Sequence, residues 1–387
     1  MLADMLKIIR KKEVDMPQFE NLKVIISGGG TGGHVFPAIA IANAIKNREP
    51  GAKILFIGAK GRMEMEKVPA AGYHILGLNI SGLQRRLTLK NFLVPFKAID
   101  SYIRARNIVK RFRPDVVVGV GGYASGPMLR AASSLGVPTV IQEQNSYPGL
   151  TNKMLAKKAH KICVAYDGLE RFFPKEKIFL TGNPVRQDII NIEGKREEAL
   201  QFFGLSDEKK ILLIIGGSLG ARSINESIVE HLRLFISKDI QVIWQTGKYF
   251  YPQAESFAKE FQNSGVRVYP FINRMDLAYA AASMVVSRAG AIAVSEICAV
   301  RIPAILVPSP NVTEDHQTKN AMALVNFQAA TLVKDIEAKQ QLGPVVVELI
   351  EDEIRMHRQK EKMASFAFRD SADMIASVVF SVITKTA

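Results

Sequence analysis

The sequence has little cysteine and no long apolar run. Its 387 residues include only Cys163 and Cys298, each within an apolar stretch, which predicts reduced thiols in a cytoplasmic protein. No run of about eighteen apolar residues occurs, so no transmembrane helix is expected. Residues 1–12 mix Leu and Ile with Lys and Arg, and they lack the apolar core and cleavage site of a signal peptide.

Two further absences restrict the chemistry. No Asp-x-Asp motif occurs, so nothing in the sequence predicts a metal ion on a diphosphate, and neither a metal nor a cofactor is expected. The formal charge of +14 favours an anionic partner. Basic segments without interleaved aromatic residues do not form a base-stacking platform, so we expect no nucleic-acid partner.

What the sequence does contain is a repeated alternation of short apolar runs with helical patterns. Strand-like runs occupy residues 22–28, 52–59, 114–122, 137–145 and 159–166. The rhythm restarts at 209–228 and continues with runs at 239–245, 266–270, 283–287 and 303–307. This pattern predicts an α/β protein with two Rossmann-like, doubly wound parallel sheets. We expect domains at 1–184 and 185–365, and a C-terminal helix, within 366–387, that returns to the first domain.

A glycine-rich loop follows the first apolar run. Gly28, Gly30 and Gly33 satisfy G-x-G-x-x-G between a predicted strand and a predicted helix, which favours a ligand at the helix N-terminus. A dinucleotide site would add an acidic residue about twenty positions later, but residues 58–60 are Gly-Ala-Lys. Hydride transfer is therefore disfavoured. His34 lies just beyond the loop, at the edge of the sheet where ligands dock.

A second glycine loop opens the second half. Residues 216–220 read Gly-Gly-Ser-Leu-Gly, which fits the nucleophile elbow of hydrolases as well as a phosphate-binding turn. Because this turn begins a new half of the protein, we favour Ser218 and the loop amides as a phosphate site. Further along, Glu296 follows Gly290 by two helical turns, where a carboxylate can accept hydrogen bonds from ribose hydroxyls.

Seven segments together closely resemble the MurG family of peptidoglycan glycosyltransferases. They are GGGTGGHVFPAIAIA, VGVGGYASGP, QEQNSYPGLTNK, TGNPVR, GGSLGARSIN, SRAGAIAVSE and EDHQTKNA, in this order. The resemblance runs from about residue 21 to the C-terminal helix. It implies a GT-B fold with the lipid acceptor on the first domain and the UDP-GlcNAc donor on the second. The implied reaction is an inverting transfer of N-acetylglucosamine from UDP-GlcNAc to the C4 hydroxyl of undecaprenyl-diphospho-N-acetylmuramoyl-pentapeptide, which converts lipid I to lipid II. The alternative is a related GT-B transferase with another lipid acceptor, such as diacylglycerol.

The resemblance also implies a set of site residues. The donor sugar is expected near Thr31, Gly32, Gly33, Asn145, Gln317 and Asn320. The nucleotide is expected to contact Arg186 and Ser218 through its diphosphate, Ile272 through uracil and Glu296 through ribose, with Ala291, Ile292 and Ala293 at the adjoining helix start. The acceptor side comprises Gly30 and Tyr123, with His34 as the candidate general base and Glu143 as its rival. Two departures from the family stand out: His316 precedes Gln317, and Gln-Arg-Arg follows residues 81–83.

A basic and apolar segment predicts how the protein reaches a lipid substrate. Residues 81–113 carry nine Lys or Arg residues and one acid. Apolar side chains within a basic rim can dip into lipid headgroups while cations meet anionic lipids, although a helix face plus ordinary core explains many of them too. The predicted membrane-contacting residues are Leu83, Arg85, Arg86, Phe92 and Phe96. We expect peripheral binding to the anionic cytoplasmic face of the bacterial inner membrane, where other cell-wall synthesis proteins are candidate partners.

Overall fold

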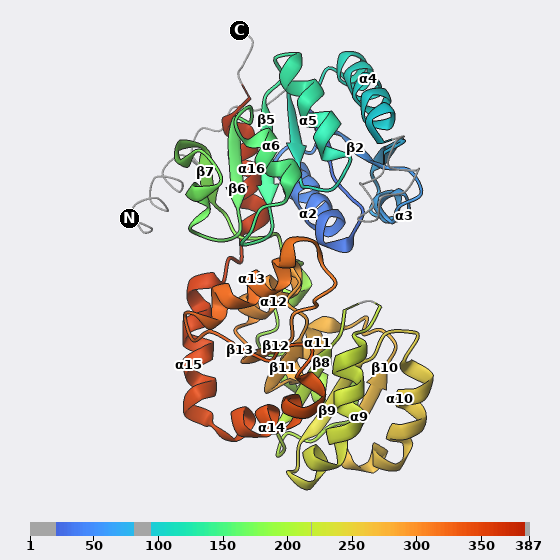
Figure 1. The fold of residues 1–387 in the computed structure, drawn as a ribbon, viewed down its shortest axis with the longest axis vertical. Helices are drawn as coiled ribbons and strands as arrows, with labels where there is room; N and C mark the ends of the chain where they lie inside the picture. Colours follow the sequence, from blue (N-terminus) through green and yellow to red (C-terminus); the bar gives the residue numbers. More distant parts are fainter. Residues whose placement is uncertain (1–20, 81–93, 218, 384–387) are drawn as a thin grey trace.

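The computed structural model describes residues 21–80, 94–217 and 219–383, without the side chains of residues 94–97 and 313. Two lobes lie one above the other, each built around one parallel sheet (Figure 1). Strands such as Val116–Gly119 and Ile211–Ile215 are buried along their whole length. Continuous burial is typical of parallel strands covered by helices on both faces.

The first sheet has the strand order β3-β2-β1-β4-β5-β6-β7 in the described residues. Its strands are β1 (Lys23–Ser27), β2 (Lys53–Ala59), β3 (His74–Leu78), β4 (Val116–Gly119), β5 (Thr139–Glu143), β6 (Lys161–Val164) and β7 (Ile178–Leu180). Its helices are α2 (Gly32–Arg48), α3 (Glu64–Ala70), α4 (Val94–Phe112), α5 (Ser125–Ser134) and α6 (Leu150–Ala156). The order reverses between β1 and β4, which is where ligands bind in open parallel sheets.

The second sheet has the order β10-β9-β8-β11-β12-β13. Its strands are β8 (Ile211–Ile215), β9 (Gln241–Gln245), β10 (Val266–Tyr269), β11 (Met284–Ser287), β12 (Ala304–Leu306) and β13 (Thr331–Leu332). The helices are α7 (Gln187–Ile190), α8 (Arg196–Phe203), α9 (Arg222–Ser237), α10 (Tyr251–Ala258), α11 (Met275–Ala281), α12 (Ala291–Val300), α13 (His316–Val325), α14 (Ala338–Glu351) and α15 (Glu353–Met363). Here the order reverses between β8 and β11, so both lobes present a switch point.

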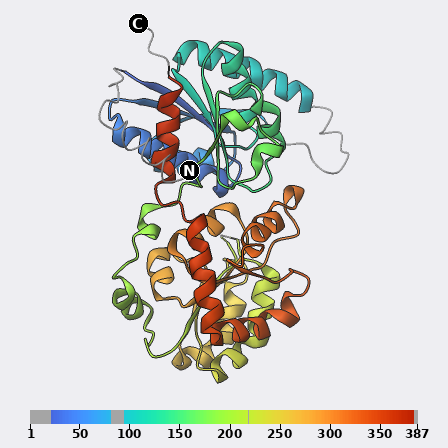
Figure 2. The ribbon, with the colours of Figure 1, turned by 90° about the vertical axis from the view of Figure 1, so that its left-hand side faces the viewer.

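The C-terminal part of the chain is not one continuous helix. Asp352 interrupts it and caps α15 by accepting a hydrogen bond from the Arg355 N–H at 2.8 Å. After a second break at 364–370, α16 (Ser371–Ser381) packs on α2 in the upper lobe (Figure 2). Ile375 and Val379 of α16 join the core of the first lobe. The predicted domain boundaries at 184 and 365 stay predictions.

Three short strands, β3, β7 and β13, were missed by the sequence pattern. All three lie at sheet edges, and apart from Leu78 of β3 their side chains are partly or fully exposed. An edge strand covers less of the core, so its residues do not form the continuous apolar run by which the central strands are recognised. Among the described helices, none is both long and apolar enough to cross a membrane.

Candidate active site

The first glycine loop joins β1 to α2 at the switch point of the first sheet. Gly30 has a φ of 90°, a conformation that favours glycine. A Cβ on Gly28 would lie 2.2 Å from Val120 Cγ2, and one on Gly122 would lie 2.3 Å from the Gly29 carbonyl oxygen. The loops after β1 and β4 therefore pack backbone against backbone, which only glycine permits.

His34 stands in the first turn of α2 beside this loop, partly exposed. Its Nδ1 lies 3.2 Å from Thr31 Oγ1. The pKa of His34 lies at about 4, below its usual value, because desolvation and nearby His316 lower it more than the Gly29 backbone and the Glu64 carboxylate raise it. The imidazole is therefore neutral near pH 7 and one ring nitrogen keeps its lone pair, as a general base requires.

Glu143, the rival candidate, ends β5 and is fully enclosed. Its Oε1 accepts hydrogen bonds from the Asn145 backbone N–H at 3.0 Å and side-chain amide at 3.2 Å. Its Oε2 accepts from the Gly149 N–H at 3.2 Å and from Asn152 Nδ2 at 2.8 Å. Burial raises the pKa of Glu143, and these hydrogen bonds oppose the rise. Both carboxylate oxygens thus hold the loop that leads into α6.

Asn320 joins the two lobes at the base of the site. It lies on α13, is buried, and donates through Nδ2 to Asn145 Oδ1 at 3.1 Å. Its Oδ1 accepts from the Ser146 backbone N–H at 2.9 Å. Beside this pair, the Lys319 ammonium lies 3.3 Å from the centre of the Tyr147 ring. In Figure 1, α13 and α12 lie at the top of the lower lobe, facing the upper one.

The second glycine loop follows β8 and leads to α9. Gln245, at the end of β9, accepts from the Ile272 N–H at 2.9 Å and donates through Nε2 to the Gly217 carbonyl at 3.2 Å. It therefore fixes the loop after β10 against the second glycine loop. An open recess of about 510 Å³ lies beside this loop. Its lining consists of Gly216, Gly220, Ala221, Arg222, Ser223, Glu226, Arg288, Ser309, Asn311, Gln317 and Asp335.

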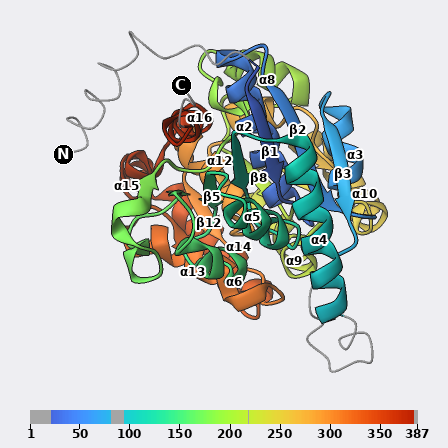
Figure 3. The same cartoon turned by 90° about the horizontal axis from the view of Figure 1, so that it is seen from above.

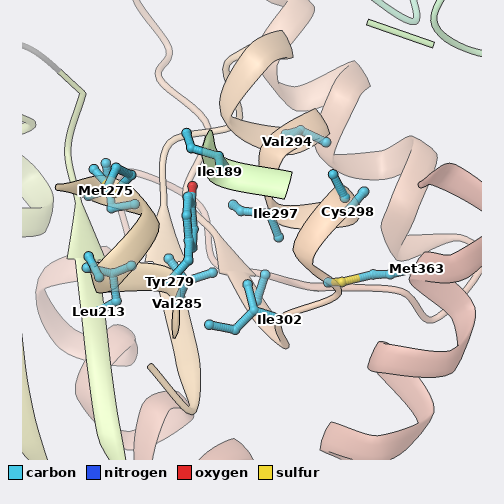
Figure 4. Packing of buried hydrophobic residues seen from close by; sticks show 14 of the residues in the cluster. Ile189, Leu213, Met275, Tyr279, Val285, Val294, Ile297, Cys298, Ile302 and Met363 are labelled. Atoms are coloured by element: carbon cyan, nitrogen blue, oxygen red, sulfur yellow. The ribbon is translucent and has the colours of Figure 1, made fainter. Parts of the chain in front are cut away.

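Glu296 projects from α12, whose opposite face packs in the core. Figure 4 shows Val294, Ile297 and Cys298 of this helix among the buried residues around Tyr279. The pKa of Glu296 is raised to about 7, because burial and the Asp188 carboxylate raise it more than Arg186 and the Tyr279 hydroxyl lower it. The Tyr279 hydroxyl lies 3.5 Å from Glu296 Oε2. A carboxylate that is costly to ionise and faces a cation is typical of a binding site.

Comparison with known proteins supplies the family. The N-terminal domain of glycosyltransferase family 28 matches residues 24–164, and the C-terminal domain of that family matches residues 211–375. The crystal structure of Acinetobacter baumannii MurG superimposes with a TM-score of 0.75 at 27% identity, covering 93% of this chain and 99% of that one. The chain belongs to the MurG family of glycosyltransferases. The predicted GT-B fold of two Rossmann-like domains is confirmed.

Relatives of this MurG family member match it over most of its length. One is the UDP-N-acetylglucosamine--N-acetylmuramyl-(pentapeptide) pyrophosphoryl-undecaprenol N-acetylglucosamine transferase of Parabacteroides distasonis, which is 54% identical over 363 residues, 94% of this chain and 99% of the relative. The protein of the same name from Bacteroides fragilis is 55% identical over 369 residues, 94% of this chain and 97% of the relative. The dehydrogenase and hydrolase alternatives therefore do not apply.

The structure brings most of the predicted MurG-type site residues to the two facing sheet edges. Thr31 and Tyr123 are exposed, and the partly exposed members are Gly30, Gly32, Gly33, Asn145, Ala291, Ile292, Ala293 and Gln317. Arg186 is half-exposed, with its Nε 3.9 Å from Asp188 Oδ1. Several of these groups already have hydrogen-bond partners in the protein, among them the Gly30 N–H, the Ile272 N–H, Asn145, Gln317 and Asn320.

Several of the predicted site and membrane residues lie outside the residues that the structure describes. Ser218, Leu83, Arg85, Arg86 and Phe92 are not among the described residues, and Phe96 lies in α4 without a described side chain. Among the described residues, no group of three or more His, Cys, Asp or Glu side chains could hold a metal ion.

Sequence reasoning missed two residues that support the site, Glu64 and Gln245. Glu64 begins α3 and accepts a hydrogen bond from the Gly30 N–H at 2.9 Å. Gln245 ends a fully buried strand, as Glu143 does. A polar residue at the C-terminal end of an apolar strand is the sequence signal that could have identified Gln245. Glu64 follows the next strand by five residues and leaves no comparable mark in the sequence.

The raised pKa of Glu296 predicts a pH-dependent contribution to stability. Its carboxyl has a pKa near 4.5 when unfolded and about 7 when folded, so folding favours the protonated form. This contribution is complete below about pH 4.5 and is lost as the pH rises through 7. Glu296→Gln, which cannot ionise, should therefore be more stable relative to wild type at pH 8 than at pH 5. Urea unfolding at both pH values measures this, and an equal stability difference at the two would contradict it.

Proposed function

We propose that this protein transfers N-acetylglucosamine from UDP-GlcNAc to the C4 hydroxyl of undecaprenyl-diphospho-N-acetylmuramoyl-pentapeptide. The observation that carries the proposal is 54% identity over 94% of the chain to a transferase named for this reaction. Facing sheet edges in two lobes suit a reaction between two separate substrates. The protein uses its second domain for the nucleotide and its first domain for the lipid diphosphate.

The transfer is a single displacement. The acceptor C4 oxygen forms a bond to the anomeric carbon while the bond from that carbon to the UDP oxygen breaks, so the configuration inverts. His34 takes the proton of the attacking hydroxyl, because its neutral ring carries a lone pair at the edge of the first domain. Glu143 orders the loop through residue 149 and keeps Asn145 in place, since both of its oxygens are occupied.

The leaving UDP is held by the second domain. Glu296 accepts hydrogen bonds from the ribose hydroxyls, and Arg186, Ser218 and the amides of the second glycine loop stabilise the charge that grows on the diphosphate. The start of α12 has no side-chain cap. Its free N–H groups are suited to polar groups of the donor.

An acceptor panel tests the proposed reaction. The purified protein is incubated with UDP-[14C]GlcNAc and either undecaprenyl-diphospho-N-acetylmuramoyl-pentapeptide or diacylglycerol, each in detergent. Label should appear in the first lipid only. UDP-glucose is the donor control, and it should transfer poorly. Labelled diacylglycerol would favour the alternative acceptor instead.

We also propose that the protein binds the anionic cytoplasmic membrane surface through residues 83–97. Next to this segment, Ile99 and Ile103 of α4 are 59% and 53% exposed, four residues apart on one face of the helix. In Figure 3, α4 lies at the rim of the molecule, away from α16. Exposed isoleucines beside lysines and arginines suit an interface that combines apolar insertion with attraction to anionic lipid.

Charge reversal in this segment should strongly weaken binding to anionic vesicles. Arg85→Glu, Arg86→Glu and Lys90→Glu together should reduce sedimentation with vesicles containing anionic phospholipid at least tenfold, because each cation contributes on the order of 1 kcal/mol near such a surface. Salt should weaken wild-type binding, and neutral vesicles should bind poorly.

The control variant carries Lys209→Glu, Lys238→Glu and Lys259→Glu, three exposed lysines of the second domain. It matches the change in net charge and should sediment like wild type. Equal losses in both triple variants would mean that overall charge, not this segment, governs binding.

A further inference from the structure

Glu64 is a buried carboxylate beside the proposed active site. Only 1% of its surface is exposed. Its Oε2 accepts from the Gly30 N–H at 2.9 Å, and its Oε1 accepts from the Ala59 N–H at 2.9 Å. Burying a carboxylate costs free energy unless it is well hydrogen-bonded, so such a group calls for a reason beyond packing.

Two glycines leave the room that this carboxylate occupies. A Cβ on Gly29 would lie 2.2 Å from Glu64 Oε1, and one on Gly58 would lie 2.5 Å from Glu64 Cγ. The first glycine loop is therefore shaped around the Glu64 side chain. Of the glycines read from the sequence as a ligand-binding pattern, Gly30 donates its N–H to this carboxylate.

One peptide unit separates Glu64 from His34. The N–H of the Gly29–Gly30 peptide donates to the Glu64 carboxylate, and the Gly29 backbone on the other side of the same peptide raises the pKa of the His34 ring. The His34 ring packs tightly against the loop after β4, because a Cβ on Gly121 would lie 2.8 Å from His34 Nε2. Hydrogen bonds in such a chain polarise one another, so a carboxylate at one end strengthens the bond at the other.

We propose that Glu64 is a positioning residue for the transfer reaction, acting through the Gly29–Gly30 peptide on His34. It keeps the ring proton on the nitrogen that faces Gly29 and so leaves the lone pair on the other nitrogen. This rests on the proposed function, in which that nitrogen takes the proton of the C4 hydroxyl. The imidazolium that forms is then stabilised by the Gly29 backbone and by the negative charge of Glu64, both of which raise the pKa of His34.

Two titratable groups face His34 from neighbouring elements. Glu64 of α3 raises the pKa of His34 and His316 of α13 lowers it. Glu64→Gln removes the negative charge and keeps nearly the same side-chain shape. Its NH2 group, itself a donor, then faces one of the two backbone N–H groups that donate to Glu64 and cannot accept from it. We expect Glu64→Gln to lower the pKa of His34 further and to make the two neutral tautomers of the His34 ring more equal in population.

The test compares Glu64→Gln with Glu66→Gln, an exposed glutamate two residues along the same helix. Glu64→Gln should lower kcat at least about tenfold, with the KM for UDP-GlcNAc within about twofold of wild type. In the free protein, 15N NMR of labelled histidine should show one neutral tautomer of His34 in wild type and a mixture in Glu64→Gln. Glu66→Gln should match wild type in all measurements.

A double-mutant cycle separates positioning from simple support of the loop. If Glu64 acts through His34, Glu64→Gln should cost less than about twofold in kcat when added to His34→Ala. A full tenfold loss in that background would overturn the proposal, and so would an unchanged His34 spectrum in Glu64→Gln.

The NMR measurement needs no turnover, so it separates this proposal from the proposed function. Failure of the wild-type protein to label the lipid would overturn the function, while the His34 spectra would still decide the coupling. Should Glu64→Gln not fold, the wild-type spectrum alone decides: a rapidly averaging mixture of His34 tautomers would overturn the proposal.

Discussion

His34→Ala should lower kcat at least about a hundredfold while the KM for UDP-GlcNAc stays within about threefold of wild type. A positioned general base contributes about 10²–10⁴-fold, and its loss affects the transition state without weakening donor binding. The neutral ring beside Thr31 is the observation behind this expectation. Steady-state kinetics with a water-soluble analogue of the lipid acceptor provides both constants.

The matched control is His74→Ala, which removes an exposed histidine from β3 at the far edge of the same sheet. Its kinetics should equal those of wild type. Activity of His34→Ala within a few fold of wild type would assign His34 to structure. Glu143 would then become the remaining candidate base, even though it must first give up its hydrogen bonds to residues 145–152.

Glu296→Ala should raise the KM for UDP-GlcNAc about tenfold to a hundredfold and change kcat much less. Hydrogen bonds to a charged group contribute about 1.5–3 kcal/mol, and contacts to ribose are similar in the ground and transition states. Since the pKa of Glu296 is about 7, the KM difference between wild type and variant should narrow at pH 6, where wild type is largely protonated.

Donor titrations at pH 6 and pH 8 measure this effect. Glu361→Ala, at an exposed glutamate of α15, is the control and should leave the KM unchanged. An unaltered KM in Glu296→Ala at pH 8 would remove Glu296 from the ribose site. A large fall in kcat with unchanged KM would instead place it nearer to the reacting atoms.

The sequence by itself determined the fold class and the two points at which the strand order reverses. Central strands such as β4 and β8 are buried on both faces, so they appear as continuous apolar runs, and glycine loops mark the two places where strand order reverses. These signals are local, because they depend on residues that are neighbours in the sequence and not on contacts that form during folding. They sufficed to predict two parallel sheets, and they led us to propose His34 and Glu296 as site residues.

Only the tertiary structure decided which polar groups are free and which are already engaged. The sequence could not reveal that Glu143 has both oxygens occupied, that Asn320 spans the two lobes, or that Glu64 reaches Gly30 from 34 residues away. Burial and neighbouring charge set the pKa values of His34 and Glu296, and both depend on segments distant along the chain. The chain order fixes which residues follow each strand, but hydrogen bonding and desolvation depend on distances that exist only after folding.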